Sequence, residues 1–193
     1  MIAVTVNSDS STNMTDSISS AQPDDIVPEH LPVAAGDDVD RETTQYVHDD
    51  ADYCAHDTDG RVVVGVTRGE GQDGDSEVLL LTDADGDHAI LPNDHVENGD
   101  WQAVARKTVA NSTGLSIDCD DVALVRAVDH RVEGEDEIRE RTHHVLFHAT
   151  PTAETPAPAC DEDGWTAEWV AEVPAVFDDE SGDVRDDIAR FLD

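Results

Sequence analysis

The sequence predicts an α+β domain that follows a disordered acidic tail. Three observations predict this class. Short β-branched apolar runs alternate with turn residues over most of the chain, one stretch changes to the period of an amphipathic helix, and the N-terminal part has few apolar residues. We expect a tail over residues 1–52 and a single domain over residues 53–193.

The tail is rich in Ser, Thr, Asp and Pro, and Arg41 is its one basic residue. Such a segment cannot bury enough apolar surface to offset the entropy lost when the chain becomes ordered, so we expect disorder. An alternative remains open, in which the stretch IVPEHLPVAA docks as a short element.

Strands are expected where β-branched and aliphatic residues lie between Gly, Pro and Asp turns. These stretches are residues 61–67, 77–82, 89–91, 122–132, 143–149 and 165–170. The run 89–91 leads directly into Pro92, which ends it.

Two stretches have helical spacing. From residue 100 to 113 the apolar and small side chains recur at i, i+3, i+4, i+7 and i+8, and they are Trp101, Val104, Ala105, Thr108, Val109 and Ser112. Asp100 is suited to the N-cap and Gly114 to the C-terminal stop. A short closing helix is expected from Val184 to Leu192. The predicted order is β-β-(β)-α-β-β-β-α.

The charge is strongly negative: 46 Asp and Glu stand against 11 Lys and Arg, which gives a net charge of −35. Phosphate backbones and anionic membranes repel such a chain, so we expect neither nucleic acid nor membrane as a partner. Lys107 is the one lysine, and Asp outnumbers Glu. This composition resembles that of proteins from salt-loving archaea, whose surface charge is screened by molar salt.

The three cysteines, Cys54, Cys119 and Cys160, have no C-x-x-C spacing and suggest neither a disulfide framework nor a zinc site. No apolar run approaches the ~18 residues of a membrane span, and no signal peptide is evident. We therefore expect a cytoplasmic protein.

The stretch ILPNDHVENGDWQAVARKTVANSTGLSI, residues 90–117, resembles the Nudix box, whose pattern is G-x5-E-x7-R-E-U-x-E-E-x-G-U with U a bulky aliphatic residue. The flanking runs RVVVGVT, EVLLLTD and HHVLFHA and the late segment GWTAEWVAEVPAVF extend the resemblance. It implies a Nudix-like α/β/α sandwich with a mixed sheet. It also implies Mg²⁺- or Mn²⁺-dependent hydrolysis of nucleoside-diphosphate-linked compounds.

The metal-binding part of the box is replaced. With the glycine of the box aligned on Gly114, its arginine falls on Lys107 and its helical glutamates fall on Thr108, Asn111 and Ser112. These three side chains carry no charge to offset the dehydration of a hard divalent cation. We expect no metal at these positions and no cofactor, with Mg²⁺ or Mn²⁺ required only if the protein is an enzyme.

Carboxylates outside the helix are the remaining candidates for catalysis: Glu97 and Asp100 before the helix, and Glu137 in the acidic stretch 133–140. In an ordinary acidic protein these would be solvated loop residues. For ligand binding the candidates are Arg126, Arg131 and Lys107. Arginines 126, 131, 139 and 141 could clamp a phosphate or carboxylate, or they could form ion pairs with nearby acids.

Histidines are frequent in the middle of the domain. His144 and His148 share one face of their strand and His143 lies on the other, so His130 could meet one of them at a transition-metal site. The alternative is a set of half-buried, hydrogen-bonded strand histidines.

Two functions therefore remain. In the favoured one, the fold is kept, the metal site is lost, and the protein binds a nucleoside-diphosphate-like small molecule or acts as an interaction domain, with little or no catalysis. In the alternative, a divergent metal-dependent Nudix hydrolase uses carboxylates from the loops.

Overall fold

A computed structural model describes residues 39–50, 58–69, 76–97, 99–153, 165–177 and 182–192. The expected disorder of residues 1–38 and the possible docking of IVPEHLPVAA lie outside the described residues, as do Cys54 and Cys160. In the described part of the chain, no helix has the length and apolar character that crossing a bilayer requires.

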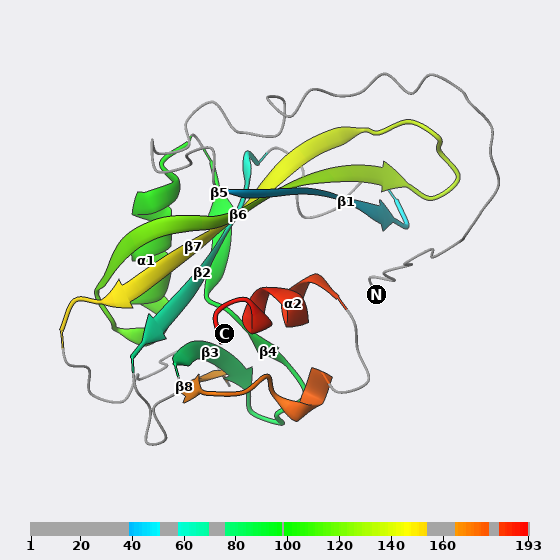
Figure 1. The fold of residues 1–193 in the computed structure, drawn as a ribbon. Helices are drawn as coiled ribbons and strands as arrows, with labels where there is room; N and C mark the ends of the chain where they lie inside the picture. The colour runs from blue at the N-terminus through cyan, green and yellow to red at the C-terminus, as the bar shows by residue number, and fades with distance from the viewer. Residues whose placement is uncertain are drawn as a thin grey trace.

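Eight strands form a mixed sheet in the order β1-β6-β7-β2-β3-β4, with β5 paired to β2 and β8 paired to β3 (Figure 1). Their bounds are β1 Asp40–His48, β2 Gly60–Arg68, β3 Glu77–Asp83, β4 Ala89–Ile90, β5 Asn93–Val96, β6 Ile117–Val132, β7 Glu140–Pro151 and β8 Trp165–Val170. β1 runs parallel to β6 and β2 parallel to β7, and the other pairs are antiparallel. The predicted α+β class with a mixed sheet is confirmed.

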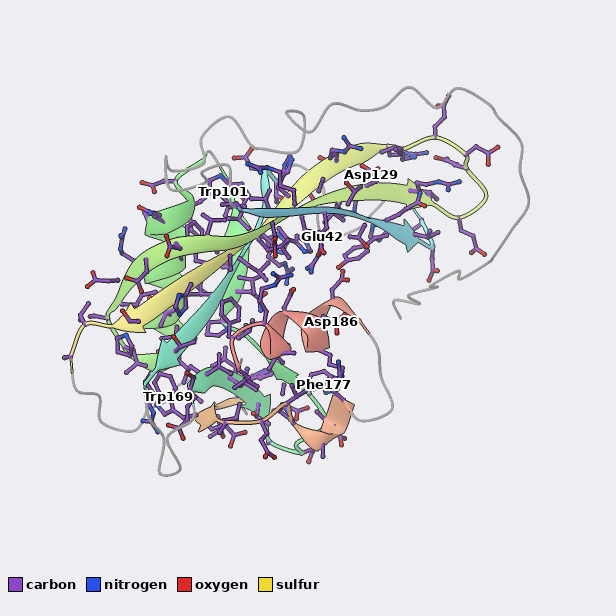
Figure 2. All side chains as sticks on the ribbon, viewed as in Figure 1. Glu42, Trp101, Asp129, Trp169, Phe177 and Asp186 are labelled. Atoms are coloured by element: carbon purple, nitrogen blue, oxygen red, sulfur yellow. The ribbon has the colours of Figure 1, made fainter. Side chains whose placement is uncertain are left out.

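Two helices, α1 (Trp101–Thr113) and α2 (Asp183–Ala189), cover opposite faces of the sheet, and a 3-10 turn, η2 (Ala175–Phe177), precedes α2 (Figure 1). The protein has two hydrophobic cores, one on each face of the sheet, and alternate residues of β2 belong to different cores. Val62 and Val64 pack with Trp101 and Val109 of α1, while Val63 belongs to the core that contains Ile188 of α2. Figure 2 shows Trp101 on one side of the sheet and Phe177 and Asp186 on the other. The layers are therefore helix, sheet, helix.

The capping residues of α1 behave as the sequence predicts. The Asp100 carboxylate accepts a hydrogen bond from the Ala103 N–H at 3.0 Å, which satisfies one of the free amides of the first turn. Gly114 ends the helix in the left-handed region, with φ 72°. Trp101, Thr108 and Val109 are buried, and Val104 is half-buried against the same core.

The predicted domain boundary at residue 53 is wrong for residues 40–48, because they form β1. This strand, DRETTQYVH, has almost no apolar residues, so its composition resembles that of the tail. It is ordered through backbone pairing with β6, in register from Asp40↔Leu124 to His48↔Val132. Side chains add to the pairing: Glu42 accepts a hydrogen bond from Arg126, and the Tyr46 hydroxyl donates to Asp183 at 2.9 Å.

The other strands match their predicted positions, with two differences. β5 (Asn93–Val96) was not expected, since its residues NDHV are mostly polar. β6 begins at Ile117 and β7 extends from Glu140 to Pro151, so the two form a long hairpin whose acidic loop projects beyond the layers (Figure 1).

Candidate functional site

A row of polar side chains crosses the sheet from β5 to β1. His95 of β5 lies opposite Arg61 of β2, Arg61 opposite His144 of β7, His144 opposite Arg126 of β6, and Arg126 opposite Glu42 of β1. Because these positions are in register, their side chains project from one face of the sheet. This is the face covered by α2, and α1 packs on the other.

Beside this row lies a cavity of about 360 Å³ between the sheet and α2. Four of its lining residues are apolar: Val63, Ile90, Leu91 and Val184. Its polar walls include Arg61, His95, His144 and Arg126 of the row, together with Asp183 and Asp187 of α2. The cavity therefore combines an apolar surface with a small set of convergent polar groups, which is typical of small-molecule sites.

The charge of Arg126 is neutralised within the protein. Arg126 is 3% exposed, its guanidinium donates to both oxygens of Asp187 at 3.0 and 2.7 Å, and its Nε donates to Glu42. Burial alone would lower the pKa of Arg126, but the hydrogen bonds and charge of Asp187 outweigh this and raise it. Arg126 therefore stays charged, and it fastens α2 and β1 to β6.

Arg61 has different surroundings. Its Nη1 donates to Asn93 Oδ1 at 2.6 Å and its Nη2 lies 3.1 Å from His95 Nε2. Within the described ranges, no carboxylate forms an ion pair with this guanidinium. A cation held by neutral groups against a cavity retains its attraction for an anion.

The histidines of the cavity are uncharged at neutral pH. Burial lowers the pKa of His144 to about 3, with the positive charges of Arg126 and Arg61 adding to the effect. Burial also lowers the pKa of His95, His130 and His48. The imidazoles thus act here as neutral hydrogen-bonding groups.

A second chain of hydrogen bonds links β1 to β6 and β7. His48 Nε2 lies 2.9 Å from His130 Nδ1, and His130 Nε2 lies 2.7 Å from the Thr142 hydroxyl. Tyr46 packs edge-on against His130, and burial raises the pKa of its hydroxyl. β1 therefore contributes Tyr46 and His48 to the cavity wall.

Of the residues nominated for catalysis or ligand binding, Arg126 lines the cavity, and of the histidines nominated for a transition-metal site, His130 and His144 do so. Glu97 and Asp100 are exposed beside the start of α1, where Asp100 serves as the N-cap, and Glu137 is exposed in the hairpin loop. Lys107 is exposed on α1. Arg131 lies on β6, where it donates to the Glu135 carbonyl at 2.5 Å.

The divalent cation that the Nudix-box resemblance implies does not fit the residues of α1. Thr108 is buried and its hydroxyl has no hydrogen-bond partner, Asn111 is exposed, and the Ser112 hydroxyl donates to the Thr108 carbonyl at 2.8 Å. They share one face of the helix, but none of them offers a carboxylate. Among the described residues, no three His, Cys, Asp or Glu side chains are grouped as a metal ion requires.

The arginines could clamp an anion or form ion pairs, and the histidines could bind a metal or form hydrogen bonds within the protein. Arg131, Arg139 and Arg141 form ion pairs with Asp136, Glu135 and Asp129, respectively. His130 bonds to His48 and Thr142. His148 lies 2.7 Å from the Thr67 hydroxyl. These contacts match the ion-pair and hydrogen-bonded interpretations.

Arg61, His95, Tyr46 and Asp187 were not nominated from the sequence. A usable signal existed for one of them, since Arg61 begins the apolar run RVVVGVT and its side chain shares a face with Val63. The other three belong to polar or short segments whose position depends on pairing with distant strands.

No family model matches the sequence, and none of the curated proteins matches it. Solved structures are similar at low identity. A C. elegans Ap4A hydrolase has a TM-score of 0.48 and 13% identity, covering 68% of this chain and 93% of its own. A NUDIX hydrolase from Nitrosomonas europaea has a TM-score of 0.47 and 16% identity, covering 69% of this chain and 70% of its own.

A third structure, the E. coli dihydroneopterin triphosphate pyrophosphohydrolase, has a TM-score of 0.45 and 16% identity, covering 69% of this chain and 94% of its own. At such identities the similarity concerns the arrangement of the chain and not the chemistry of a site. The protein has an α+β fold with a mixed sheet and two covering helices. The chain arrangement of these solved structures resembles this fold.

Proposed function

We propose that this is a Nudix-type protein that binds a nucleoside-diphosphate-like small molecule in the cavity between the sheet and α2, with little or no catalysis. The observation that carries the proposal is the cavity itself, which places the cationic Arg61 and neutral histidines beside an apolar wall. Its volume of about 360 Å³ lies at the lower end of the range for small-molecule sites, roughly 300–1,000 Å³.

The replaced box supports the binding role over catalysis. Thr108, Asn111 and Ser112 provide no negative charge on α1, and they lie across the sheet from the cavity. A nucleotide hydrolase of the usual type needs carboxylates that hold Mg²⁺ against the diphosphate. The two carboxylates that line the cavity already accept hydrogen bonds within the protein: Asp183 from Tyr46, and Asp187 from Arg126.

The competing role is a divergent hydrolase that recruits metal through loop carboxylates. The box-like stretch favours it, because Glu97 and Asp100 are exposed beside the start of the helix. Glu137 would have to act from the hairpin loop.

Titration calorimetry with Mg²⁺ and Mn²⁺ in molar KCl, followed by assays on a panel of nucleoside-diphosphate substrates, separates the two roles. We expect no saturable metal binding and no metal-dependent turnover, but heat on addition of a nucleotide. Turnover that Glu97→Gln or Glu137→Gln abolishes would establish the hydrolase. If the protein showed neither turnover nor nucleotide binding, both the nucleotide-binding role and the hydrolase role would be refuted. The role of an interaction domain would then remain.

The working environment is part of the proposal. We propose a reducing, salt-rich cytoplasm, on the strength of the net charge of −35 and the cysteine spacing. The negative charge also argues against nucleic acid and membrane partners.

A further inference from the structure

We propose that Arg61 binds the phosphate group of the ligand. Arg126, which the sequence nominates for ligand binding, then has a structural role. The two arginines are separated by His144 in the same row across the sheet, so position does not distinguish them. Their partners do. This inference rests on the proposed nucleotide binding and assigns the anionic end of the ligand within the same cavity.

The two arginines differ in the charge of their neighbours. Arg126 bonds to Asp187 and Glu42, and Asp183 lies 3.9 Å away, so three carboxylates surround one cation. An added phosphate would meet net negative charge there. Arg61 bonds to the amide oxygen of Asn93 and to an imidazole nitrogen of His95, both neutral.

His95, beside Arg61, has a ring N–H without a partner. An arginine can only donate hydrogen bonds, so His95 Nε2 accepts the one from Arg61. A neutral His95 then carries its proton on Nδ1, which is buried and has no hydrogen-bond partner. Unsatisfied buried donors are uncommon in native proteins and call for an explanation. A donor of this kind beside Arg61 makes the neighbourhood more favourable to an anion.

An apolar surface lies beside Arg61 in the cavity. Val63 lies two residues further along β2, and Ile90 and Leu91 also line the cavity. A ligand with its phosphate on Arg61 can therefore place an apolar or aromatic body against these side chains. The combination fits a nucleoside monophosphate or the terminal phosphate of a similar compound.

The test compares the binding of AMP and of adenosine by calorimetry on the full chain in molar KCl. We expect AMP to bind at least about tenfold more tightly than adenosine, as a charge-assisted hydrogen bond contributes roughly that factor. In Arg61→Gln the two should bind equally, with adenosine unaffected. Arg61→Lys, which keeps the charge but loses the planar fork, should retain part of the preference for AMP.

Arg139→Gln is the matched control, because it removes one positive charge from an exposed ion pair with Glu135 in the hairpin loop. It should keep the full preference. If Arg61→Gln and Arg61→Lys both retained the wild-type preference for AMP, the anchor would be elsewhere and the inference would be overturned, while nucleotide binding would stand. If wild-type protein bound adenosine and AMP equally, the inference would also fail. Failure to bind either compound would overturn the proposed function as well.

Discussion

His144 shows how one half-buried side chain should make stability depend on pH. Burial lowers the pKa of His144 from 6.5 to about 3. Between these two values the unfolded chain binds the proton and the folded protein does not. The free energy of unfolding should therefore fall as the pH falls below about 6.5, and the contribution of His144 should be fully present above that value.

We predict that His144→Gln flattens this dependence. From about pH 6.5 downward the wild type should lose up to about 1.4 kcal/mol per pH unit more than the variant. Urea unfolding at several pH values in molar KCl measures the two slopes. The His88 side chain is 74% exposed and pairs with Asp83 at the surface, so His88→Gln should change the slope far less than His144→Gln does. Equal slopes for wild type and His144→Gln would show that the imidazole is not desolvated in solution.

Asp187 is the second residue with a large expected effect. It is 6% exposed and neutralises the buried Arg126 through two hydrogen bonds. Asp187→Asn leaves Arg126 with much less compensation, so we predict a loss of about 3–5 kcal/mol in the free energy of unfolding. Asp186→Asn removes the same charge from an exposed neighbour and should change stability by less than about 0.5 kcal/mol. Similar losses in both variants would contradict the structural role of the Arg126–Asp187 pair.

Among the elements, β1 is the one whose importance the sequence hides. Its nine residues pair with β6 and bring Glu42, Tyr46 and His48 to the cavity side of the sheet. Without it, the edge of β6 would be exposed and Arg126 would lose one carboxylate.

We predict that chains beginning at Val39 and at Asp49 behave differently. The chain from Val39 should melt at the same temperature as the full-length protein, as its missing residues are those expected to be a disordered tail. The chain from Asp49 should melt at least about 5 °C lower, because it lacks β1. Thermal melting in molar KCl compares them. An unchanged melting temperature for the shorter chain would mean that β1 contributes nothing to stability.

At the scale of the whole molecule, the net charge of −35 is the main electrostatic feature. The described ion pairs place carboxylates around most arginines, but acids exceed bases by far, so the excess must be screened by ions. In molar salt the Debye length is about 3 Å, which suppresses this repulsion.

We predict that the melting temperature rises steeply from dilute buffer to molar KCl. Screening acts on the excess charge and depends on ionic strength, so NaCl at the same ionic strength should produce a similar rise. Calorimetric melting over a series of KCl concentrations tests this. A midpoint that does not depend on salt would remove the salt-adapted interpretation.

The sequence by itself determined the elements whose local pattern is strong. The apolar runs predict β2, β3 and β8, and the helical spacing with Asp100 and Gly114 at its ends predicts α1. Local signals suffice here because burial of one face is encoded in the period of the apolar residues.

The tertiary structure decided the rest. β1 and β5 carry little apolar pattern and become strands through pairing with β6 and β2. The cavity is assembled from residues of six strands and α2 that lie up to about 140 positions apart, such as Tyr46 and Asp183. The different states of Arg61 and Arg126 follow from which strand and helix lie beside each one. A charge is compensated by neighbours in space, and pairing between distant strands is what sets those neighbours.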